Sequence, residues 1–359
     1  MVSMGLEQEI KDQALALGFD AVAIANTAPI AAGHVEHFER WLQSGCAGRM
    51  DYMHRNREKR FHPAQLRKGA KSVIVVALNY RPPKSIADSA SPGTGQMPAS
   101  MAELMDTAQE SSPHPADSQI RNPQSAIRNP PAEPVGRVAM YAQYEDYHVF
   151  IKALLRELAA FICMRTHQQD RFKVCVDSAP VAEKALAVRA GLGFIGKNHL
   201  LVHPQLGPQI LLGELLTGLS LEPDQPIEGS CLGCSRCLDA CPTGALRPDG
   251  LLDATRCISY LTQYGQGDVS SGSTGNWLLG CDECLRVCPF HEKAPACANR
   301  RFRFYPERAK LDLQDLVGLT PETFEAKFRD SPLRRLGLEK VQCNARRCRE
   351  SQIPDWQGI

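Results

Sequence analysis

Eight cysteines between positions 231 and 288 constrain this chain more than any other feature. They form two runs that each end in Cys-Pro, with one cysteine between the runs: Cys231-x2-Cys234-x2-Cys237-x3-Cys241-Pro242, then Cys257, then Cys281-x2-Cys284-x3-Cys288-Pro289. In the first pattern, three thiolates bind one [4Fe-4S] cluster and the fourth, before proline, binds a second cluster nearby. The sequence therefore predicts two adjacent clusters, and hence electron transfer.

Two such clusters need eight thiolates, and the second run supplies only three. Cys257 is the candidate for the missing ligand. The crossed arrangement predicts one cluster on Cys231, Cys234, Cys237 and Cys288, and a second cluster on Cys241, Cys257, Cys281 and Cys284. C-x2-C pairs also bind zinc, but a zinc ribbon needs four thiolates, and the x2-x2-x3 spacing and the prolines have no zinc rationale.

The chain has 359 residues, of which 43% are hydrophobic, enough for two or three domains with cores of their own. Its first 20 residues are charged and amphipathic, and no run of about 18 apolar residues occurs. Fourteen cysteines fit a reducing compartment, where thiols stay available for metal. We therefore expect a cytoplasmic protein that does not span a membrane, and a monomer. With a net charge of +1, only local basic patches can indicate a nucleic-acid partner.

Hydrophobic periodicity predicts a mixed helix and strand domain over residues 1–228. Helices are expected at 6–17, 147–164 and 180–190, and strands at 19–25, 72–78, 173–177 and 210–217. The run at 72–78 is unbroken and apolar, which predicts a strand covered on both faces. Residues 84–135 contain eight prolines and eight serines but no aromatic residue, so we expect a disordered insertion there.

A proline-bracketed linker at 223–226 separates this first domain from the cysteines. The predicted fold is thus an α/β (α+β) domain at 1–228, a ferredoxin-like double [4Fe-4S] domain at 229–295, and a helical, basic C-terminal region at 296–359. Two clusters imply an electron acceptor within the first domain. No G-x-G-x-x-G follows a predicted strand there, so a dinucleotide site of the Rossmann type is not supported.

The chain resembles the epoxyqueuosine reductase family along nearly all of its length outside the insertion. The segments that carry the resemblance are 50–53, 58–60, 70–73, 146–148, 176–180, 189–198, 241–246, 256–262 and 280–282. The resemblance implies two [4Fe-4S] clusters, a cobalamin bound in the first domain, and reduction of epoxyqueuosine to queuosine at the wobble position of tRNA. It also implies that Cys257 is the eighth cluster ligand, and that the second cluster lies beside the cobalamin.

Roles for single residues also follow from the resemblance. Asp177 matches the acid that protonates the substrate, and its place after an apolar strand predicts a carboxyl whose pKa is raised by burial. Taken without the resemblance, Asp177 fits better as a cap of the following helix. Arg60, Asp146, Lys197 and Ser259, together with Asp177, are candidates for contact with the cobalamin. Asp146-Tyr147-His148 is similar to a cobalamin-ligating D-x-H motif, but Ile151 replaces its glycine, so we expect no axial histidine.

The implied partners are tRNA carrying epoxyqueuosine and a low-potential electron donor such as ferredoxin or flavodoxin. Phosphates are neutralised by Lys and Arg. The candidates for this contact are Arg300, Arg301, Arg303, Arg334 and Arg335. The ordinary alternative for each arginine is a solvated helix face.

Several positions depart from the family pattern: residues 143–145 replace a Trp-Gly pair, residues 290–291 replace Trp-Asn, 341–344 are altered, and Ala139 stands where some members have cysteine. We expect these changes to spare the clusters and to touch substrate-facing regions. They leave open a cobalamin and iron-sulfur reductase of a small organic molecule, similar to reductive dehalogenases, or a ferredoxin-like electron carrier without catalysis.

Overall fold

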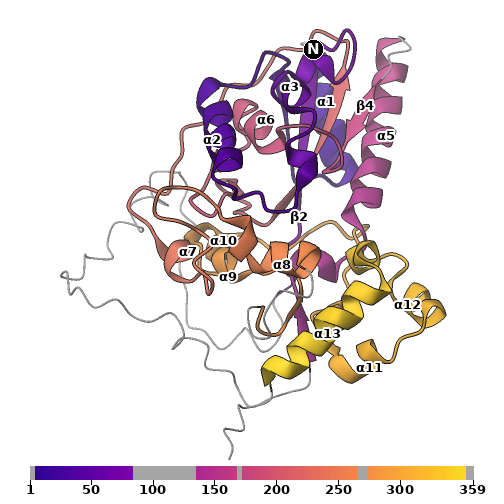
Figure 1. Ribbon diagram of the computed structural model, residues 1–359. Coiled ribbons are helices and arrows are strands. Elements are labelled where there is room, and N and C mark those ends of the chain that lie inside the picture. Colours follow the sequence, from indigo (N-terminus) through magenta and orange to yellow (C-terminus); the bar gives the residue numbers. More distant parts are fainter. Residues whose placement is uncertain (1–4, 84–134, 168–171, 266–273, 353–359) are drawn as a thin grey trace, which may run out of the picture.

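The structure is a computed structural model, and it describes residues 5–83, 135–167, 172–265 and 274–352 (Figure 1). The predicted insertion lies outside the described residues, apart from Val135 at its end. In the described part of the chain, none of the helices combines the length and apolar character needed to cross a membrane.

The central sheet has four strands in the order β1 (Ala21–Asn26), β2 (Ser72–Asn79), β7 (Ile210–Thr217) and β4 (Lys173–Cys175). All three neighbouring pairs are antiparallel. Every residue of β2 is buried, which confirms a strand covered on both faces.

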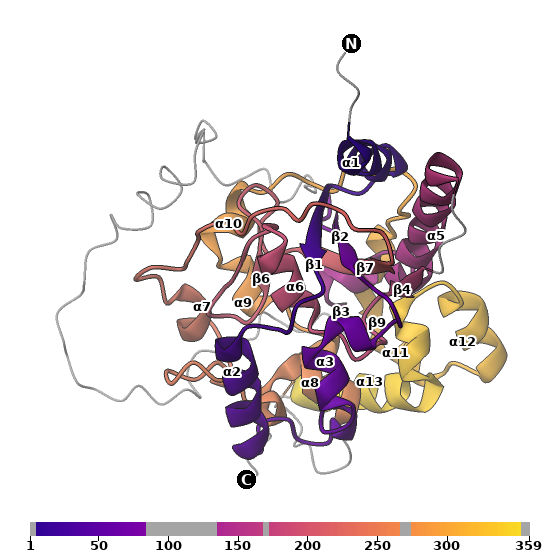
Figure 2. The same ribbon diagram turned by 90° about the horizontal axis from the view of Figure 1, so that it is seen from above.

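Helices cover both faces of this sheet (Figure 2). On one face, Ile74 and Val76 pack against α1 (Leu6–Leu17) and α5 (Tyr147–Thr166). On the other face, Val73 and Val75 pack against α6 (Glu183–Arg189), and α2 (Ala32–Gln43) joins the same cluster at its edge. The alternation along β2 thus divides the first domain into two cores.

The helices of the cysteine segment are short: α7 (Arg236–Asp239), α8 (Ile258–Tyr264), α9 (Glu283–Arg286) and α10 (Pro289–Lys293). The C-terminal region is helical as predicted, with α11 (Leu313–Val317), α12 (Pro321–Phe328) and α13 (Leu338–Gln352). The remaining short elements are the helix α3 (Arg57–Phe61), the hairpin of β5 (Phe194–Ile195) and β6 (Leu201–Val202), and the 3-10 turns η1 (Asp51–Met53), η2 (Pro63–Gln65), η5 (Met140–Gln143), η6 (Ala254–Arg256), η7 (Pro306–Arg308) and η8 (Pro332–Leu336).

A second sheet joins the three predicted segments. Its order is β8 (Trp277–Leu279), β3 (Val135–Val138) and β9 (Lys310–Asp312), so one strand comes from each segment. β3 pairs parallel with β8 and antiparallel with β9. The C-terminal core closes over this sheet, since buried side chains of β8 and β9 share one apolar cluster with α11 to α13.

The helices and strands that the sequence predicts in the first domain all form, but several boundaries differ, and the strand expected from 19 begins at Ala21. The strand expected at 173–177 ends at Cys175, and the helix expected from 180 begins at Glu183. Between them the chain turns sharply: the amide of Ser178 donates to the Val176 carbonyl over 2.6 Å, and Asp177 has a φ of 56°. This conformation is unusual for a residue other than glycine, and it projects Asp177 out of the sheet's hydrogen-bond ladder.

Candidate cluster sites and candidate active site

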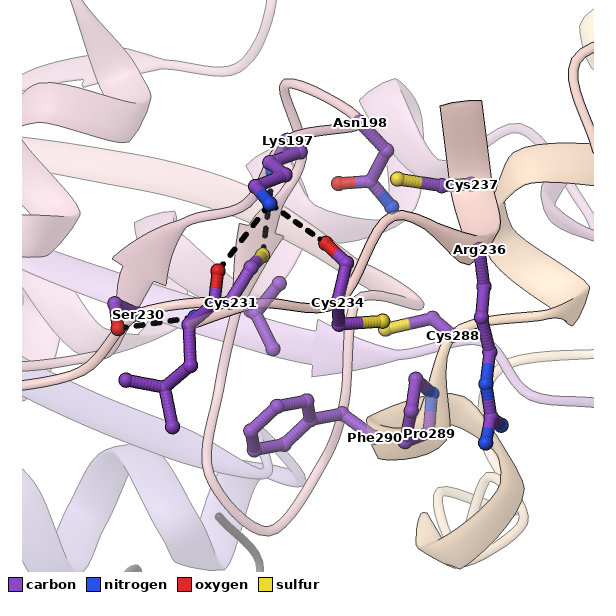
Figure 3. A pocket seen from close by; sticks show the side chains of 12 residues that line it. Lys197, Asn198, Ser230, Cys231, Cys234, Arg236, Cys237, Cys288, Pro289 and Phe290 are labelled. Carbon is purple, nitrogen blue, oxygen red and sulfur yellow. Dashed lines mark hydrogen bonds between the residues drawn. The ribbon is translucent and has the colours of Figure 1, made fainter. Parts of the chain in front are cut away.

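The first predicted set of cysteines converges on one pocket (Figure 3). Its walls include all four thiols, those of Cys231, Cys234, Cys237 and Cys288. All four are free of disulfides. Burial, followed by the charges of the other three thiolates, raises the pKa of Cys237 to about 11. A bound metal lowers the pKa of such thiols, because its positive charge stabilises each sulfur as a thiolate.

The second predicted set also gathers in space. Burial, followed by the charges of Cys281, Cys257 and Cys241, raises the pKa of Cys284 well above its ordinary value. Cys237 adds a smaller contribution to the same shift, so the two sets are neighbours. The helices α7 and α9, one from each run, lie in contact and bring the runs together.

The thiols fit clusters better than single ions. Among the described residues, no group of three or more His, Cys, Asp or Glu side chains converges closely enough to hold one metal ion. A four-iron cube carries one thiolate at each of four irons, so its ligands stand farther apart than those of one zinc. The grouping of the two sets therefore supports the crossed arrangement predicted from the spacing.

A second, much larger cavity of about 1670 Å³ lies between the first domain, the cysteine segment and the C-terminal region. This volume exceeds the 300–1,000 Å³ typical of pockets for drug-sized ligands. Its walls include residues that are near two cysteines of the second set in sequence: Ala254 comes three residues before Cys257, Gln263 six residues after it, and Leu279 two residues before Cys281. The cavity therefore reaches the segments that carry the second set.

Asp177 stands on the wall of this cavity, and its side chain is 59% exposed. The Tyr147 hydroxyl donates to Asp177 Oδ2 over 2.8 Å, and His148 Nε2 lies 3.2 Å from the same oxygen. On the other side of the ring, His148 Nδ1 lies 2.7 Å from Asp146 Oδ1. The buried imidazole therefore bridges two carboxylates, one in the cavity and one behind it.

These contacts set the protonation states. The pKa of Asp177 is lowered, chiefly by the hydrogen bond from His148. Burial acts in the opposite direction and raises this pKa, and the hydrogen bond from Tyr147 lowers it further. Burial lowers the pKa of His148, but the hydrogen bonds to Asp146 and Asp177 outweigh it and raise that pKa. The prediction of a raised pKa for Asp177 is therefore wrong, because two donors meet its carboxylate. The two shifts have opposite signs, so this pair of groups favours the proton on His148 and the charge on Asp177.

Asp177 is not a helix cap, since α6 begins six residues later without a side-chain cap. The backbone amide of Asp177 instead donates to Glu183 Oε1 over 2.6 Å. Burial, followed by the charge of Asp177, raises the pKa of Glu183 to about 7. Asp146 does act as a cap, because its side chain accepts from the His148 amide at the start of α5.

The other predicted cofactor residues are placed differently from one another. Arg60 lines the large cavity, and its buried Nε has no hydrogen-bond partner. This Nε–H can therefore donate to an acceptor on a ligand. Lys197 lines both cavities. Ser259 and Asp146 are not among the cavity-lining residues; Asp146 acts through His148. These five cofactor contacts stay predictions.

Sequence reasoning missed Tyr147, His148 and Glu183 as site residues. A signal for two of them was present, because Asp146-Tyr147-His148 stood out as a motif, but its local pattern is also that of a helix cap. The contact between His148 and Asp177 spans 29 positions in the chain. Such a contact is visible only once α5 and β4 are placed side by side.

The five candidate arginines do not form one group. Arg335 lines the large cavity, whereas Arg334 pairs with Glu325 over 2.9 Å. Arg301 pairs with Glu157 over 2.9 Å, and Arg303 donates to Tyr305. Arg300 is exposed. Arg335 is thus the candidate nearest to the cavity ligand, and the role of the others in binding phosphate stays a prediction.

The departures from the family pattern lie mainly in packed regions. Tyr144 is buried and stacks on Phe302 at 4.6 Å, and buried Asn344 donates to two backbone carbonyls. Phe290 lines the first cysteine pocket and packs edge-on against Phe194. The expectation that these changes touch substrate-facing regions is therefore wrong for these three residues, since none of them lines the large cavity. The expectation that the changes spare the clusters is wrong for Phe290, which lines the first cysteine pocket.

The fold and the two sites define a double-cluster iron-sulfur protein with a large ligand cavity beside its second cluster. Residues 230–291 match the family described as 4Fe-4S double cluster binding domain. Residues 116–178 match the family described as Epoxyqueuosine reductase QueG, DUF1730.

Relatives match along the whole chain. Epoxyqueuosine reductase of Pseudomonas aeruginosa is 34% identical over 339 residues, covering 93% of this chain and 82% of the relative. That of Cyclobacterium marinum is 34% identical and covers 94% of both chains. A crystal structure of epoxyqueuosine reductase with an epoxyqueuosine-modified tRNA-Tyr stem loop matches with a TM-score of 0.77 at 28% identity, covering 97% of this chain and 81% of that chain. The chain belongs to the epoxyqueuosine reductase family.

Proposed function

We propose that this protein is an oxidoreductase that reduces epoxyqueuosine to queuosine in tRNA. The observation that carries the proposal is that Asp177, Tyr147 and His148 meet on the wall of a large cavity that adjoins the second cysteine set. An electron carrier without catalysis would need neither the cavity nor this group of proton-bearing side chains. Electrons would enter from a low-potential donor such as ferredoxin or flavodoxin.

The reaction needs two electrons and two protons, because the epoxide oxygen leaves as water and the two ring carbons become an alkene. Cobalamin, when bound in the cavity, would supply the low-potential electrons for reduction of the epoxide. Arg60 is the residue best suited to hold it, since its buried Nε lacks a partner. The cavity is large enough for a macrocyclic cofactor together with the end of a flipped-out nucleoside.

Residues of this chain would hold the proton and transfer it to the substrate. His148 holds a proton between the carboxylates of Asp146 and Asp177. Asp177 Oδ2 faces the cavity and accepts from both His148 and Tyr147, so a proton can pass from His148 through Asp177 to the substrate oxygen. Glu183 fixes the backbone of Asp177 at its left-handed turn. Arg335, on the same cavity wall, would face the anionic tRNA backbone.

The direct test uses full-length protein reconstituted without oxygen with iron, sulfide and cobalamin. We expect a corrinoid spectrum, about eight irons per chain, and conversion of an anticodon stem loop carrying epoxyqueuosine to the queuosine form with a low-potential reductant. A stem loop that already carries queuosine is the control. Full loading with clusters and cobalamin but no turnover of this stem loop would contradict the proposal.

A further inference from the structure

The turn between β5 and β6, residues 196–200, belongs to the first domain but lies against the first cysteine loop (Figure 3). The Lys197 amide donates to Cys231 Sγ over 3.3 Å. Gly196 lies beside the same sulfur, since a Cβ there would be in ordinary contact with Cys231 Sγ at 3.5 Å. The turn is therefore part of the wall of the first cluster site.

The Lys197 side chain reaches further into the same loop (Figure 3). Its Nζ donates to the carbonyl oxygens of Leu232, over 3.2 Å, and Cys234, over 2.8 Å. Leu232 has a φ of 45°, a conformation that a side chain with a Cβ rarely adopts. A strained residue persists only when its surroundings hold it, and here the ammonium holds its carbonyl. Since Leu232 lies between Cys231 and Cys234, this contact fixes the spacing of two cluster ligands.

We propose that Lys197 is a positioning residue for the first cluster: it holds the Cys231–Cys234 loop and, through its charge, raises the reduction potential of that cluster. A four-iron cluster on four thiolates is anionic, and its reduction adds another negative charge. A nearby cation attracts the reduced form more strongly than the oxidised form. Net charge and hydrogen bonds at the sulfurs are known to set the potentials of such clusters.

The proposal gives the first domain a role in electron entry that is separate from its role in the cavity. The lysine that touches the first cluster loop also lines the large cavity, so one residue spans the wall between the two sites. Within the described part of the chain, the hydrogen bonds of Lys197 go to Cys231, Leu232 and Cys234, all in the first cysteine loop. The effect of Lys197 should therefore be confined to the first cluster.

Three variants separate charge from shape. Lys197→Met removes the ammonium but keeps the length of the side chain and the backbone amide that bonds Cys231. Lys197→Arg keeps the charge. Arg236→Gln is the matched control, because Arg236 lines the same pocket and is exposed like Lys197, but it lies 3.8 Å from Glu292, whose charge offsets its field.

The measurement is an anaerobic redox titration of reconstituted protein followed by electron paramagnetic resonance. The first-cluster transition is assigned with Cys234→Ser, which alters a ligand of that cluster alone. At a fixed potential, we expect Lys197→Met to lower the ratio of reduced to oxidised first cluster about tenfold, or about 59 mV for one electron. The second cluster should stay within about twofold, and Lys197→Arg and Arg236→Gln should shift the first cluster less than about threefold.

An unchanged first-cluster potential in fully loaded Lys197→Met, or an equal shift in Arg236→Gln, would overturn the proposal. If Lys197→Met loads only about four irons while Lys197→Arg loads about eight, the positioning role is supported; Lys197→Gln, whose amide can still donate to a loop carbonyl, then reports the effect of charge. Loss of the first cluster from Lys197→Arg as well would show that size alone matters at this position, which contradicts the proposal. None of these readouts depends on turnover of tRNA.

Discussion

The two ligand-bearing regions of the molecule are built in opposite ways. The first cysteine pocket has little free space, about 30 Å³, because thiols, Phe290 and Lys197 converge on it. The large cavity has about 1670 Å³, and its walls come from segments as distant as Ile30 and Leu336. The compact pocket is lined by residues between 197 and 290 and suits a cluster that carries electrons. The wide cavity is lined by residues from 30 to 336 and suits a larger ligand and its chemistry.

The largest expected effect comes from breaking the link between these regions at Cys257. Replacing it with Ala removes one ligand of the second cluster, so we expect iron to fall from about eight to about four per chain and turnover to be lost. Iron analysis and the stem-loop assay measure both. Cys343→Ala is the control, since Cys343 belongs to neither set and should leave eight irons in place. Eight irons in Cys257→Ala would show that another residue completes the second cluster.

Asp177→Asn tests the cavity alone. The amide cannot relay a proton from His148, so turnover should fall about 100- to 10,000-fold while iron and corrinoid content stay unchanged. Ser178→Ala lies on the same turn, where its hydroxyl bonds the Val176 carbonyl, and should change turnover less than about threefold. Equal losses in both variants would mean that the turn matters and the carboxylate does not.

The pH dependence sharpens the role of His148. Its raised pKa means that the proton stays bound above pH 6.5, and the single-turnover rate should fall about tenfold per unit once pH exceeds that raised value. The stabilisation from charged His148 follows the same sign: it is complete below 6.5 and is lost as pH rises through the folded-state pKa.

Asp146→Asn removes one of the two carboxylates that hold this proton, so the fall should begin at lower pH than in the wild type. Rate profiles of the two proteins, measured side by side with equal cobalamin loading, give the shift. An identical profile in Asp146→Asn would exclude His148 as the titrating group.

The smallest effect should distinguish two adjacent arginines. Arg335 lines the cavity, so Arg335→Ala should raise KM for the stem loop about tenfold. Arg334 is exposed and already paired with Glu325, and Arg334→Ala should raise KM less than about twofold. Steady-state kinetics at low and high salt compare them. Equal increases would mean that the tRNA contact lies on the outer helix face instead of at the cavity.

The cysteine sites could be predicted from the sequence more fully than the large cavity. The cluster ligands were predictable because their spacing is short and each cysteine has one dominant chemistry. The bounds of α1 and β7 were also predictable. Gly18 ends α1 with a φ of 104°, and a run of apolar residues marks β7. The structure gathers each of the two sets in space, and the assignment of each set to one cluster stays a prediction.

The proton-bearing group could not be predicted in the same way. Asp177 looked like an acid buried at a strand end, but its pKa is lowered because Tyr147 and His148 approach from another helix. Asp146 looked like a cap, and it is one, yet the same oxygen also holds His148. Local pattern reveals one role of such a residue, and the second role depends on tertiary contacts.

The sheet of β8, β3 and β9 has a practical consequence for anyone who wishes to use the cluster segment as a portable electron module. Cutting the chain at 229 and 295 would strip β8 of its partner and leave Trp277, Leu278 and Leu279, all buried here, along an open strand edge. Unpaired apolar edges recruit other chains. Such a fragment should aggregate. The cluster segment therefore depends on the rest of the chain and cannot be moved to another protein as a separate ferredoxin.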